Sequence, residues 1–518
     1  MLYRLFAVIS LTSVAAWADA PTVASVLNSV DFSTNLSPGV LVAIYGTNFG
    51  SSTSGVSISV GGKPGFISTV TPNQINAQIP FEVPPGPANL IVTVAGTASA
   101  PLAITLGSVA PAFFTVNGTG SGTALFTTTA SVPLTSAAPA KPGDTVIAYL
   151  TGLGVTNPAT PTGPAPAVLA TPVATPTLMV GGQPASIVAT SVAPNQAGLY
   201  QVAFKVPAGV QGSAPIVLSI GGKTTGAYDP KSPITFPVFG ISSIVSNASF
   251  GSAGTTTAGS IVSLFGNGFG TTSQTTGFPS TTFQGVSVTF NGTPAPLFHL
   301  SITAATTNPP SVGASQIDLL VPFELPATGT VQVALKTSSA TSPNYALTMA
   351  AGSPGIYFIA DPSTTGRFNA LAQFNNTAWL AVPDALAAAL KIPGNCTASN
   401  LSPLTLCGQP AAPGDYLVLY TTGLGKATAN GDPNGATLKT GDIPPVDGSV
   451  IYKTVETPVV TVGGLPAMVV FSGIAPGFPG EYQINFQVPG GVSGDDVPVA
   501  VSIAGSPADT RTIAIRAK

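Results

Sequence analysis

The chain has 518 residues, more than one hydrophobic core ordinarily serves, so several domains are expected. Only 6% of the residues are charged and the net charge is −3, which offers no basic field for a phosphate backbone and excludes nucleic acid as the expected partner. The chain contains 58 Gly and 51 Pro, but its alternating Val, Ile, Phe and Tyr runs supply the apolar faces that disordered chains lack. We therefore expect many short strands joined by tight turns.

The N-terminus has the pattern of a secretory signal peptide. An apolar stretch runs from Leu5 to Val14, and the sequence AWA at residues 16–18 fits an A-x-A cleavage site. The stretch is shorter than the roughly 20 residues that span a bilayer, and no later segment is apolar enough to do so. We expect residues 1–18 to be removed and the mature chain to be secreted, reaching the cell surface, the extracellular space or the periplasm.

The first repeating unit, predicted over residues 21–108, has four landmarks in a fixed order. A turn, an apolar strand and a Gly-containing corner come first, in SPGVLVAIYGTNFG (37–50). The hairpin SVGGKPG (59–65) follows, where Gly-Gly supplies the positive φ of a tight turn. Next come a Gln/Pro strand, QINAQIPF (74–81), and a final alternating strand, LIVTVAG (90–96). Short strands of this kind separated by turns are typical of a β-sandwich.

The Gln/Pro strand occurs three more times, always with Gln six positions before Pro. The further copies are QVAFKVP (201–207), QIDLLVPF (316–323) and QINFQVP (483–489). The closing Pro lacks an N–H group and should lie where the strand leaves the sheet. In the first copy, alternation predicts two faces, an apolar one of Ile75, Ala77 and Ile79 and a polar one of Gln74, Asn76 and Gln78.

The other landmarks also recur, so the sequence predicts four sandwich units of two alternating types. The A units share PFEVP or PFELP after the Gln/Pro strand, whereas the B units share VPAGV or VPGGV and a TGLG corner. The expected order is A1 (21–108), B1 (109–238), A2 (239–352) and B2 (353–518). Proline-containing joints separate A from B. The strand therefore recurs because a two-domain block was duplicated.

Unit B2 carries an insertion that predicts two further features. The segment VPDALAAALKIPG (382–394) is the one expected helix, with Pro383 and Asp384 in its first turn and Pro393 at its end. Cys396 and Cys407 are the only cysteines, and export favours a local disulfide between them. A metal or redox pair is the alternative, but the C-x-x-C spacing and a nearby His are both missing.

These motifs resemble two families. The A units, through SPGVLVAIYGTNFG, VSISVGGKPG and QINAQIPFEV, resemble IPT/TIG immunoglobulin-like domains. The B units, above all residues 422–505, resemble the uncharacterised C-terminal repeat family of secreted Solibacter-type acidobacterial proteins. The resemblance implies tandem extracellular immunoglobulin-like sandwiches, and it implies no activity, because TIG domains elsewhere serve as binding, spacing or dimerising modules.

Few residues offer catalytic chemistry. His299 is the only histidine, so one chain cannot form a His-based triad or a multi-His metal site. Glu82 and Glu324 occupy equivalent positions in FEVP and FELP, which assigns them to different units and favours an architectural role over a catalytic pair. Asp144 and Asp415, in the PGD turns, are explained by turn capping.

Two binding candidates remain. Asn430, Asp432 and Asn434 resemble the start of an oxygen-ligand calcium loop, but position twelve is Gly441 in place of the bidentate Glu, so a polar Gly-rich loop is the competing interpretation. No other cofactor is expected. Trp379 is the sole Trp after signal removal and is either a core residue or a ligand contact in the B2 insertion.

The sequence thus predicts a secreted or cell-surface, non-enzymatic modular protein acting in adhesion, carbohydrate binding or as an extracellular scaffold. An extracellular polysaccharide or a surface protein is the expected partner. The alternative is a glycan-processing enzyme with accessory sandwiches, which would need a cleft with two close carboxylates.

Overall fold

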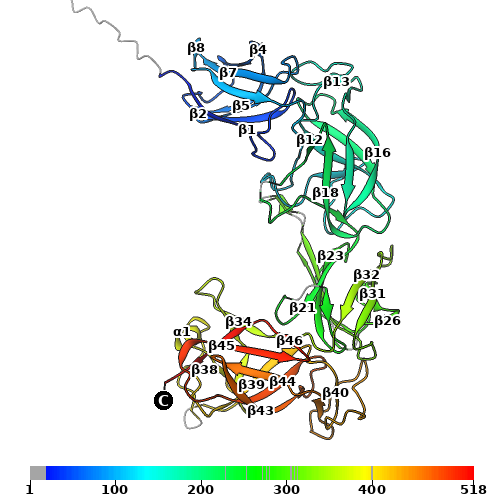
Figure 1. The fold of residues 1–518 in the computed structure, drawn as a ribbon, viewed down its shortest axis with the longest axis vertical. Coiled ribbons are helices and arrows are strands. Elements are labelled where there is room, and N and C mark those ends of the chain that lie inside the picture. Colours follow the sequence, from blue (N-terminus) through cyan, green and yellow to red (C-terminus); the bar gives the residue numbers. More distant parts are fainter. Residues whose placement is uncertain are drawn as a thin grey trace, which may run out of the picture. The chain divides into compact units, whose positions relative to one another are not determined.

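The computed structural model describes residues 19–517 except 228, 252–253, 271, 276, 279, 304–305, 308–309, 312 and 398–400. Its regular structure is β apart from one short helix in this described part, α1 (Asp384–Ala389), which confirms the all-β prediction (Figure 1). The expected signal peptide, residues 1–18, lies outside the described residues. Within them, no helix is both long and apolar enough to cross a membrane.

The chain divides into two compact units, called block 1 and block 2 below. Block 1 comprises Met1–Pro133, Thr145–Lys205 and Pro215–Phe236. Block 2 comprises Leu134–Asp144, Val206–Ala214 and Pro237–Lys518. Block 1 thus holds A1 with most of B1, and block 2 holds A2 with B2. The four unit boundaries themselves stay a prediction.

Unit A1 consists of two separate sheets. Its strands are β1 (Thr22–Asn28), β2 (Leu41–Thr47), β3 (Val56–Val60), β4 (Lys63–Pro64), β5 (Phe66–Thr71), β6 (Gln74–Gln78), β7 (Gly86–Val94), β8 (Thr97–Ala98) and β9 (Leu102–Leu106). One sheet has the order β1-β2-β6-β5, and the other has the order β4-β3-β7-β8 with β9 paired to β7. Buried side chains such as Ile44, Ile75 and Leu90 form the core.

Unit B1 has a similar arrangement of strands, but its strands are hydrogen-bonded into one continuous sheet. Its strands are β10 (Ala112–Phe113), β11 (Phe126–Thr128), β12 (Thr145–Thr151), β13 (Thr156–Asn157), β14 (Thr171–Pro172), β15 (Thr177–Val180), β16 (Gln183–Val192), β17 (Tyr200–Lys205), β18 (Gly212–Ile220), β19 (Lys223–Thr224) and β20 (Thr235–Val238). The order is β10-β12-β17-β16-β15-β18-β19. Strand β16 pairs with β15 over its first residues and with β17 over the rest, so it belongs to both layers.

Unit A2 repeats the two-sheet arrangement of A1. Its strands are β21 (Gly240–Ser246), β22 (Thr255–Thr256), β23 (Ile261–Asn267), β24 (Gln274–Thr275), β25 (Ser287–Phe290), β26 (Thr293–Pro294), β27 (Leu297–Thr303), β28 (Thr306–Thr307), β29 (Pro310–Ser311), β30 (Ala314–Leu320), β31 (Gly329–Lys336) and β32 (Tyr345–Met349). The main sheets have the orders β21-β23-β30-β27-β24 and β22-β32-β31-β25-β26.

Unit B2 repeats B1 and widens its sheet with the insertion. Its strands are β33 (Gly355–Ile356), β34 (Phe358–Ala360), β35 (Phe368–Ala370), β36 (Ala372–Phe374), β37 (Trp379–Ala381), β38 (Cys407–Gln409), β39 (Tyr416–Thr422), β40 (Ala427–Ala429), β41 (Tyr452–Thr454), β42 (Val459–Val462), β43 (Leu465–Ile474), β44 (Tyr482–Gln487), β45 (Gly494–Ile503), β46 (Ser506–Pro507) and β47 (Arg511–Ile515). The insertion adds β37 and β38 beyond β36, which pairs with β39 as β11 pairs with β12 in B1.

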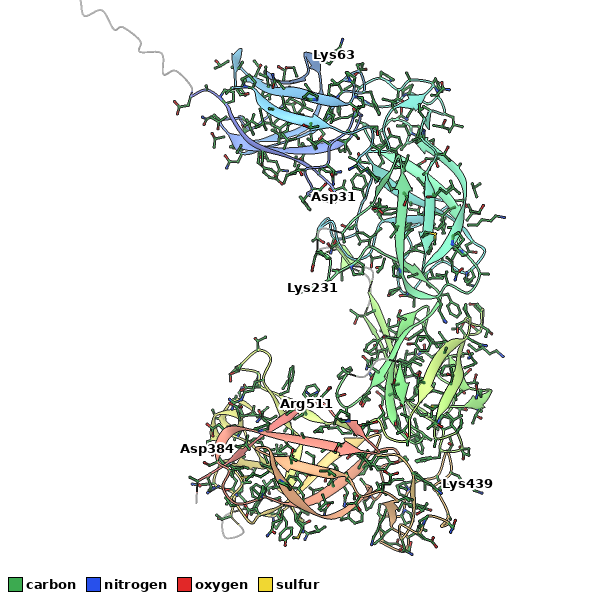
Figure 2. All side chains as sticks on the ribbon, in the orientation of Figure 1. Asp31, Lys63, Lys231, Asp384, Lys439 and Arg511 are labelled. Atoms are coloured by element: carbon green, nitrogen blue, oxygen red, sulfur yellow. A yellow bond between two sulfur atoms is a disulfide. The ribbon has the colours of Figure 1, made fainter. Side chains whose placement is uncertain are left out.

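The insertion has its own small core. Helix α1 buries Leu386 and Ala387 against Leu380 and Val382, and Asp384 lies in its first turn as the sequence predicted (Figure 2). Cys396 and Cys407 form a disulfide with a Cα–Cα distance of 5.9 Å, which confirms that prediction.

The four Gln/Pro strands are β6, β17, β30 and β44, and each lies between two other strands of its sheet. Each ends two residues before its Pro. The first Gln of each strand faces an aromatic residue across the ladder, in the pairs Tyr45–Gln74, Tyr149–Gln201, Phe265–Gln316 and Tyr420–Gln483. The repeated strand is therefore the central strand of a repeated sheet.

Two local features follow from the repeated sequence. The hairpin turns have positive φ at both central residues, for example 54° at Gly61 and 76° at Gly62, as a tight turn between twisted strands requires. The strand after each hairpin contains a bulge, centred on Ser68, Val188, Phe298 and Val470. A bulge increases the local twist of its strand. In A1 the bulged strand, β5, is also the edge of its sheet, where such a twist hinders pairing with another chain.

The predicted faces of the first Gln/Pro strand hold with one exception. Ile75, Ala77 and Ile79 are buried in the A1 core as predicted. Gln78, predicted on the polar face with Gln74 and Asn76, is completely buried. It accepts a hydrogen bond from Gly163 N at 2.7 Å, because unit B1 covers this end of the strand.

Candidate functional site at the A–B junctions

In block 2, units A2 and B2 are joined through a buried threonine at the end of β39. Thr422 Oγ1 accepts a hydrogen bond from Ile261 N of A2 at 2.8 Å and donates one to Gly480 O of B2 at 2.7 Å. Thr422 is only 1% exposed. A single hydroxyl thus satisfies a backbone donor of one sandwich and a backbone acceptor of the other, which stabilises their contact.

A second contact joins the loop after the A2 Gln/Pro strand to B2. Thr440 Oγ1 donates to Glu324 Oε2 at 2.5 Å, and Thr440 N donates to Glu324 Oε1 at 2.9 Å. The same hydroxyl accepts a hydrogen bond from Phe323 N at 2.9 Å. We call this arrangement the Glu–Thr contact.

Block 1 contains the same contacts at the equivalent positions. Thr151 Oγ1 accepts from Leu41 N at 3.0 Å and donates to Gly198 O at 2.8 Å. Thr162 donates from its hydroxyl to Glu82 Oε2 at 2.5 Å and from its backbone N to Glu82 Oε1 at 3.2 Å. The same junction contacts therefore recur in both blocks, each between two sandwiches.

The TGLG corners of the B units hold the chain segment that connects A to B. A Cβ atom added to Gly423 would lie 2.0 Å from Ser353 O, and one added to Gly152 would lie 1.9 Å from Ala110 O. Both glycines also have positive φ, so two independent constraints require glycine here. The connecting segment consequently packs directly against the corner.

A buried tyrosine completes each corner from the Gln/Pro strand side. Tyr482 Oη donates to Gly425 O at 2.7 Å, and Tyr200 Oη donates to Gly154 O. Both rings are fully buried, and burial raises the pKa of both phenols. The phenols therefore stay neutral and serve as hydrogen-bond donors.

The two junction carboxylates are ionised acceptors. Partial burial pushes the pKa of Glu324 upward, but hydrogen bonds from Thr440 and the charge of Lys439 outweigh it and lower the pKa below its usual value. The pKa of Glu82 is lowered in the same way, because hydrogen bonds from Thr162 and the charge of Lys63 outweigh its partial burial. A carboxylate that already accepts two hydrogen bonds and has a lowered pKa is unsuited to act as a general acid.

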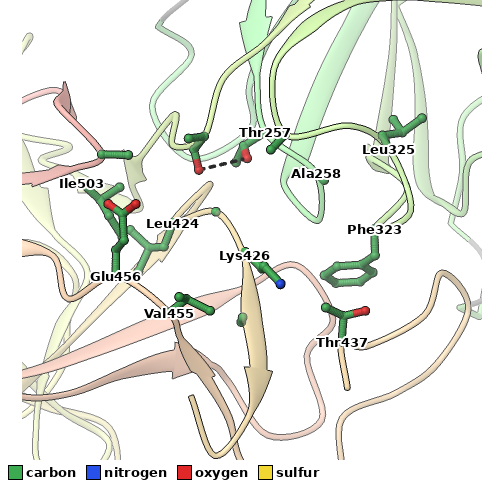
Figure 3. A pocket seen from close by; sticks show the side chains of 15 residues that line it. Thr257, Ala258, Phe323, Leu325, Leu424, Lys426, Thr437, Val455, Glu456 and Ile503 are labelled. Atoms are coloured by element: carbon green, nitrogen blue, oxygen red, sulfur yellow. Dashed lines mark hydrogen bonds between the residues drawn. The ribbon is translucent and has the colours of Figure 1, made fainter. Parts of the chain in front are cut away.

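A cavity of about 370 Å³ opens at the A2–B2 junction, beside the Glu–Thr contact (Figure 3). Its apolar wall includes Phe323 and Leu325 from A2 and Leu424, Val455 and Ile503 from B2. Figure 3 shows the side chain of Lys426 directed toward the Phe323 ring, with Glu456 on the opposite side near Ile503. The size lies within the range of small-ligand sites, roughly 300–1,000 Å³.

The cavity can hold an apolar group, but its polar side chains form no catalytic set. Its only titratable side chains are Lys426 and Glu456, and Lys426 Nζ already donates to Pro433 O at 2.8 Å. Block 1 has a smaller counterpart of about 340 Å³, lined by Phe81, Glu82 and Val155. Among the described residues, neither lining places a nucleophile next to a base.

The structure brings together some of the residues singled out from the sequence and separates others. Glu82 and Glu324 lie in different blocks, each at its own junction, as their equivalence predicted. His299 lies on β27 with Nδ1 2.9 Å from Thr275 Oγ1, away from the junction contacts. Asp144 and Asp415 each accept a hydrogen bond from the backbone at the start of their turn, as capping predicts.

The calcium candidates lie in a turn that contains a hydrogen bond to the Asp432 carboxylate. Asp432 Oδ1 accepts from Asn434 N at 2.9 Å, and Asn430 has a positive φ of 59°. These are the features of the competing interpretation, a polar loop. In the described part of the chain, no cluster of three or more His, Cys, Asp and Glu side chains could hold a metal ion.

Trp379 is half-buried on β37. Its indole Nε1 is buried and finds no hydrogen-bond partner within the described residues. This position does not distinguish a core residue from a ligand contact. The contact of Trp379 with a ligand therefore stays a prediction.

Sequence reasoning missed the junction threonines. Thr151 and Thr422 directly precede Gly-Leu-Gly, and Thr162 and Thr440 both precede Gly. These repeated Thr-Gly pairs were the available signal, but turn chemistry alone explains such pairs equally well.

Comparison with known proteins gives one family match. The model of the IPT/TIG domain matches residues 25–106, within A1. The similarity of the B units to the Solibacter-type family stays a prediction. No curated protein matches the chain.

Several solved structures show distant similarity. The plexin A4 extracellular region has 12% identity and a TM-score of 0.23, covering 95% of this chain and 30% of the plexin chain. Bacteroides ovatus SGBP-B in complex with a mixed-linkage heptasaccharide has 17% identity and a TM-score of 0.16, covering 67% of this chain and 76% of its own. Invasin, a bacterial integrin-binding protein, has 11% identity and a TM-score of 0.15, covering 95% and 78%. These low TM-scores carry no argument about function.

Proposed function

We propose that this chain is an exported, non-catalytic modular protein that attaches to extracellular carbohydrate. Each A–B block acts as a rigid two-sandwich body that presents its loops and outer sheet faces to the ligand. Adhesion and scaffolding are consequences of such attachment. The disulfide in B2 supports export, because disulfides persist in oxidising compartments.

The observation that supports this proposal most is the duplicated junction. The same hydroxyl, carboxylate and backbone groups meet in both blocks, with Thr–Glu oxygen distances of 2.5 Å in each. The groups retained in both copies hold two sandwiches together, so the shared property of the blocks is rigidity. A rigid holder lowers the entropy lost when loops bind a ligand.

Catalysis by paired carboxylates has no support at these junctions. Glu82 and Glu324 are each engaged by a threonine, and they belong to different blocks. A neutral polysaccharide suits the chain better than a charged partner, because charged residues make up only 6% of it.

The B2 insertion is the proposed contact region, with Trp379 as its aromatic contact. The test measures retention of the mature protein on insoluble cellulose, chitin, mannan and isolated bacterial cell walls. Trp379→Ala should reduce retention several-fold, since an aromatic face supplies a large part of the contact with a sugar ring. Trp379→Phe should retain more binding than Trp379→Ala.

Leu404→Ala is the matched control, because Leu404 lies in the same insertion and is 85% exposed. It should leave retention unchanged. Release of reducing sugar ends from any substrate would favour the glycan-processing alternative. Failure of the mature protein to bind any of these materials would count against carbohydrate attachment.

A further inference from the structure

The outer face of the A1 sheet carries a hollow of about 370 Å³ whose lining shares no residue with the two junction cavities. Strand β6 contributes Gln74 and Asn76, and the bulge of β5 contributes Ser68. Ser29, Phe32 and Leu41 line the remaining sides. The lining combines amide and hydroxyl groups with apolar walls, and it includes no charged side chain.

Two hydrogen-bonded amides in the hollow leave one acceptor and one donor open. Gln74 Nε2 donates to Asn76 Oδ1 at 2.7 Å, which fixes the orientation of both side chains. Within the described residues, Gln74 Oε1 and Asn76 Nδ2 make no further hydrogen bond. This open acceptor and this open donor can each bond a hydroxyl group of a sugar ring, because a hydroxyl both donates and accepts.

The equivalent face of A2 has a carboxylate, Asp318, at the centre of its hydrogen bonds. Gln316 and Ser263 both donate to Asp318 Oδ1 at 2.7 Å, and Asn247 Nδ2 donates to Ser263 Oγ at 2.9 Å. In A1 the positions of Ser263 and Asp318 are taken by Ala43 and Asn76.

The bulge residue differs as well. Where A1 has the exposed Ser68, A2 has Phe298, whose ring stacks on Phe278 with centroids 5.3 Å apart. A small residue at this point keeps the A1 hollow open. A1 therefore has a small bulge residue and an amide donor, Asn76 Nδ2, where the equivalent face of A2 has a phenylalanine and a carboxylate.

We propose that the A1 hollow is a binding subsite for a neutral sugar ring, with Gln74 and Asn76 recognising adjacent hydroxyl groups. This inference rests on the proposed carbohydrate attachment and assigns it a second site in block 1. A neutral ligand is required because a charged one would meet no opposite charge in the lining.

The test uses the full mature protein and soluble oligosaccharides of cellulose, chitin and mannan, with affinity measured by calorimetry. Asn76→Asp keeps the side-chain size, removes the donor and copies A2. It should weaken binding at least tenfold, since sites built around such hydrogen bonds reject mismatched partners. Ser68→Phe, the other A2-like change, should abolish binding at this subsite by filling it.

Gln316→Ala, at the equivalent position of A2, is the control and should leave affinity unchanged. Thermal unfolding of each variant separates loss of binding from loss of folding, and Asn76→Asp remains informative if Ser68→Phe misfolds. Unchanged affinity in both A1 variants of a protein that still binds sugar would overturn the subsite and leave carbohydrate attachment standing. Absence of any sugar binding by the unaltered protein would overturn both.

Discussion

The junctions of block 1 and block 2 use the same contacts but differ in the cavity beside them. Glu82 with Thr162 and Glu324 with Thr440 make matching hydrogen bonds. In contrast, the cavity lining has Val155 in block 1 and the positively charged Lys426 in block 2. The contacts that join the sandwiches are therefore the same in both blocks, although the cavities beside them differ in polarity.

The largest expected effect comes from the glycine corners. Gly423→Ala should destabilise block 2 by about 3 kcal/mol, because about 1–2 kcal/mol arises from positive φ and a similar amount from overpacking against Ser353 O. Gly152→Ala should act in the same way on block 1. Calorimetric unfolding of the mature protein, with a transition assigned to each block, measures both.

Gly464→Ala is the control for this prediction. Gly464 has a similar positive φ of 81°, but no atom lies within 4 Å of an added Cβ. Gly464→Ala should destabilise block 2 by only about 1 kcal/mol, the part that comes from the positive φ. Equal losses at Gly423 and Gly464 would show that the packed connecting segment contributes nothing.

A smaller effect is expected from the Glu–Thr contact. Thr440→Val removes the donor to Glu324 and the acceptor for Phe323 N, and should destabilise block 2 by about 1 kcal/mol in this partly exposed setting. Thr162→Val should lower only the transition of block 1. Thr69→Val, at an exposed position of β5, is the control and should have little effect. A shift of both transitions by either junction variant would contradict the independence of the two contacts.

The smallest effect is a pH dependence of the same contact. The folded-state pKa of Glu82 and of Glu324 is lowered, so each carboxylate stabilises its block above the unfolded-state pKa of about 4.5. This contribution is lost as the pH falls through the lowered folded-state value. Thermal unfolding followed from about pH 6 to about pH 3 should show the loss in both blocks.

Glu324→Gln should flatten this acid dependence in block 2 and leave block 1 unchanged. Gln cannot titrate, so any acid sensitivity that survives in block 2 must come from other carboxylates. An unaltered slope in the variant would mean that Glu324 does not contribute.

Much of the fold was predictable because it depends on local patterns. Alternation fixed the buried face of Ile75, Ala77 and Ile79, and Gly-Gly pairs fixed the hairpin turns. The disulfide between Cys396 and Cys407 followed from their short separation of 11 residues. Each of these features involves residues close in the chain, whose spacing limits the outcome.

The junction and the A1 hollow were not predictable in the same way. Thr162 and Glu82 are 80 residues apart, and Thr440 and Glu324 are 116 apart, so no local pattern links them. Gln78 was expected on the polar face because its own strand alternates, yet B1 covers it. Such contacts depend on how one finished sandwich packs against another.

By itself, the sequence determined the repeated strands, their turns and their inward faces, because side-chain direction along a strand alternates with a fixed period. The tertiary structure alone decided which polar residues become buried partners and which remain open to a ligand. Asn76 and Asp318 occupy equivalent places in equivalent strands, but Asn76 lies opposite Ala43, whereas Asp318 accepts a hydrogen bond from Ser263. The physical reason is that hydrogen-bond satisfaction is a property of a three-dimensional neighbourhood.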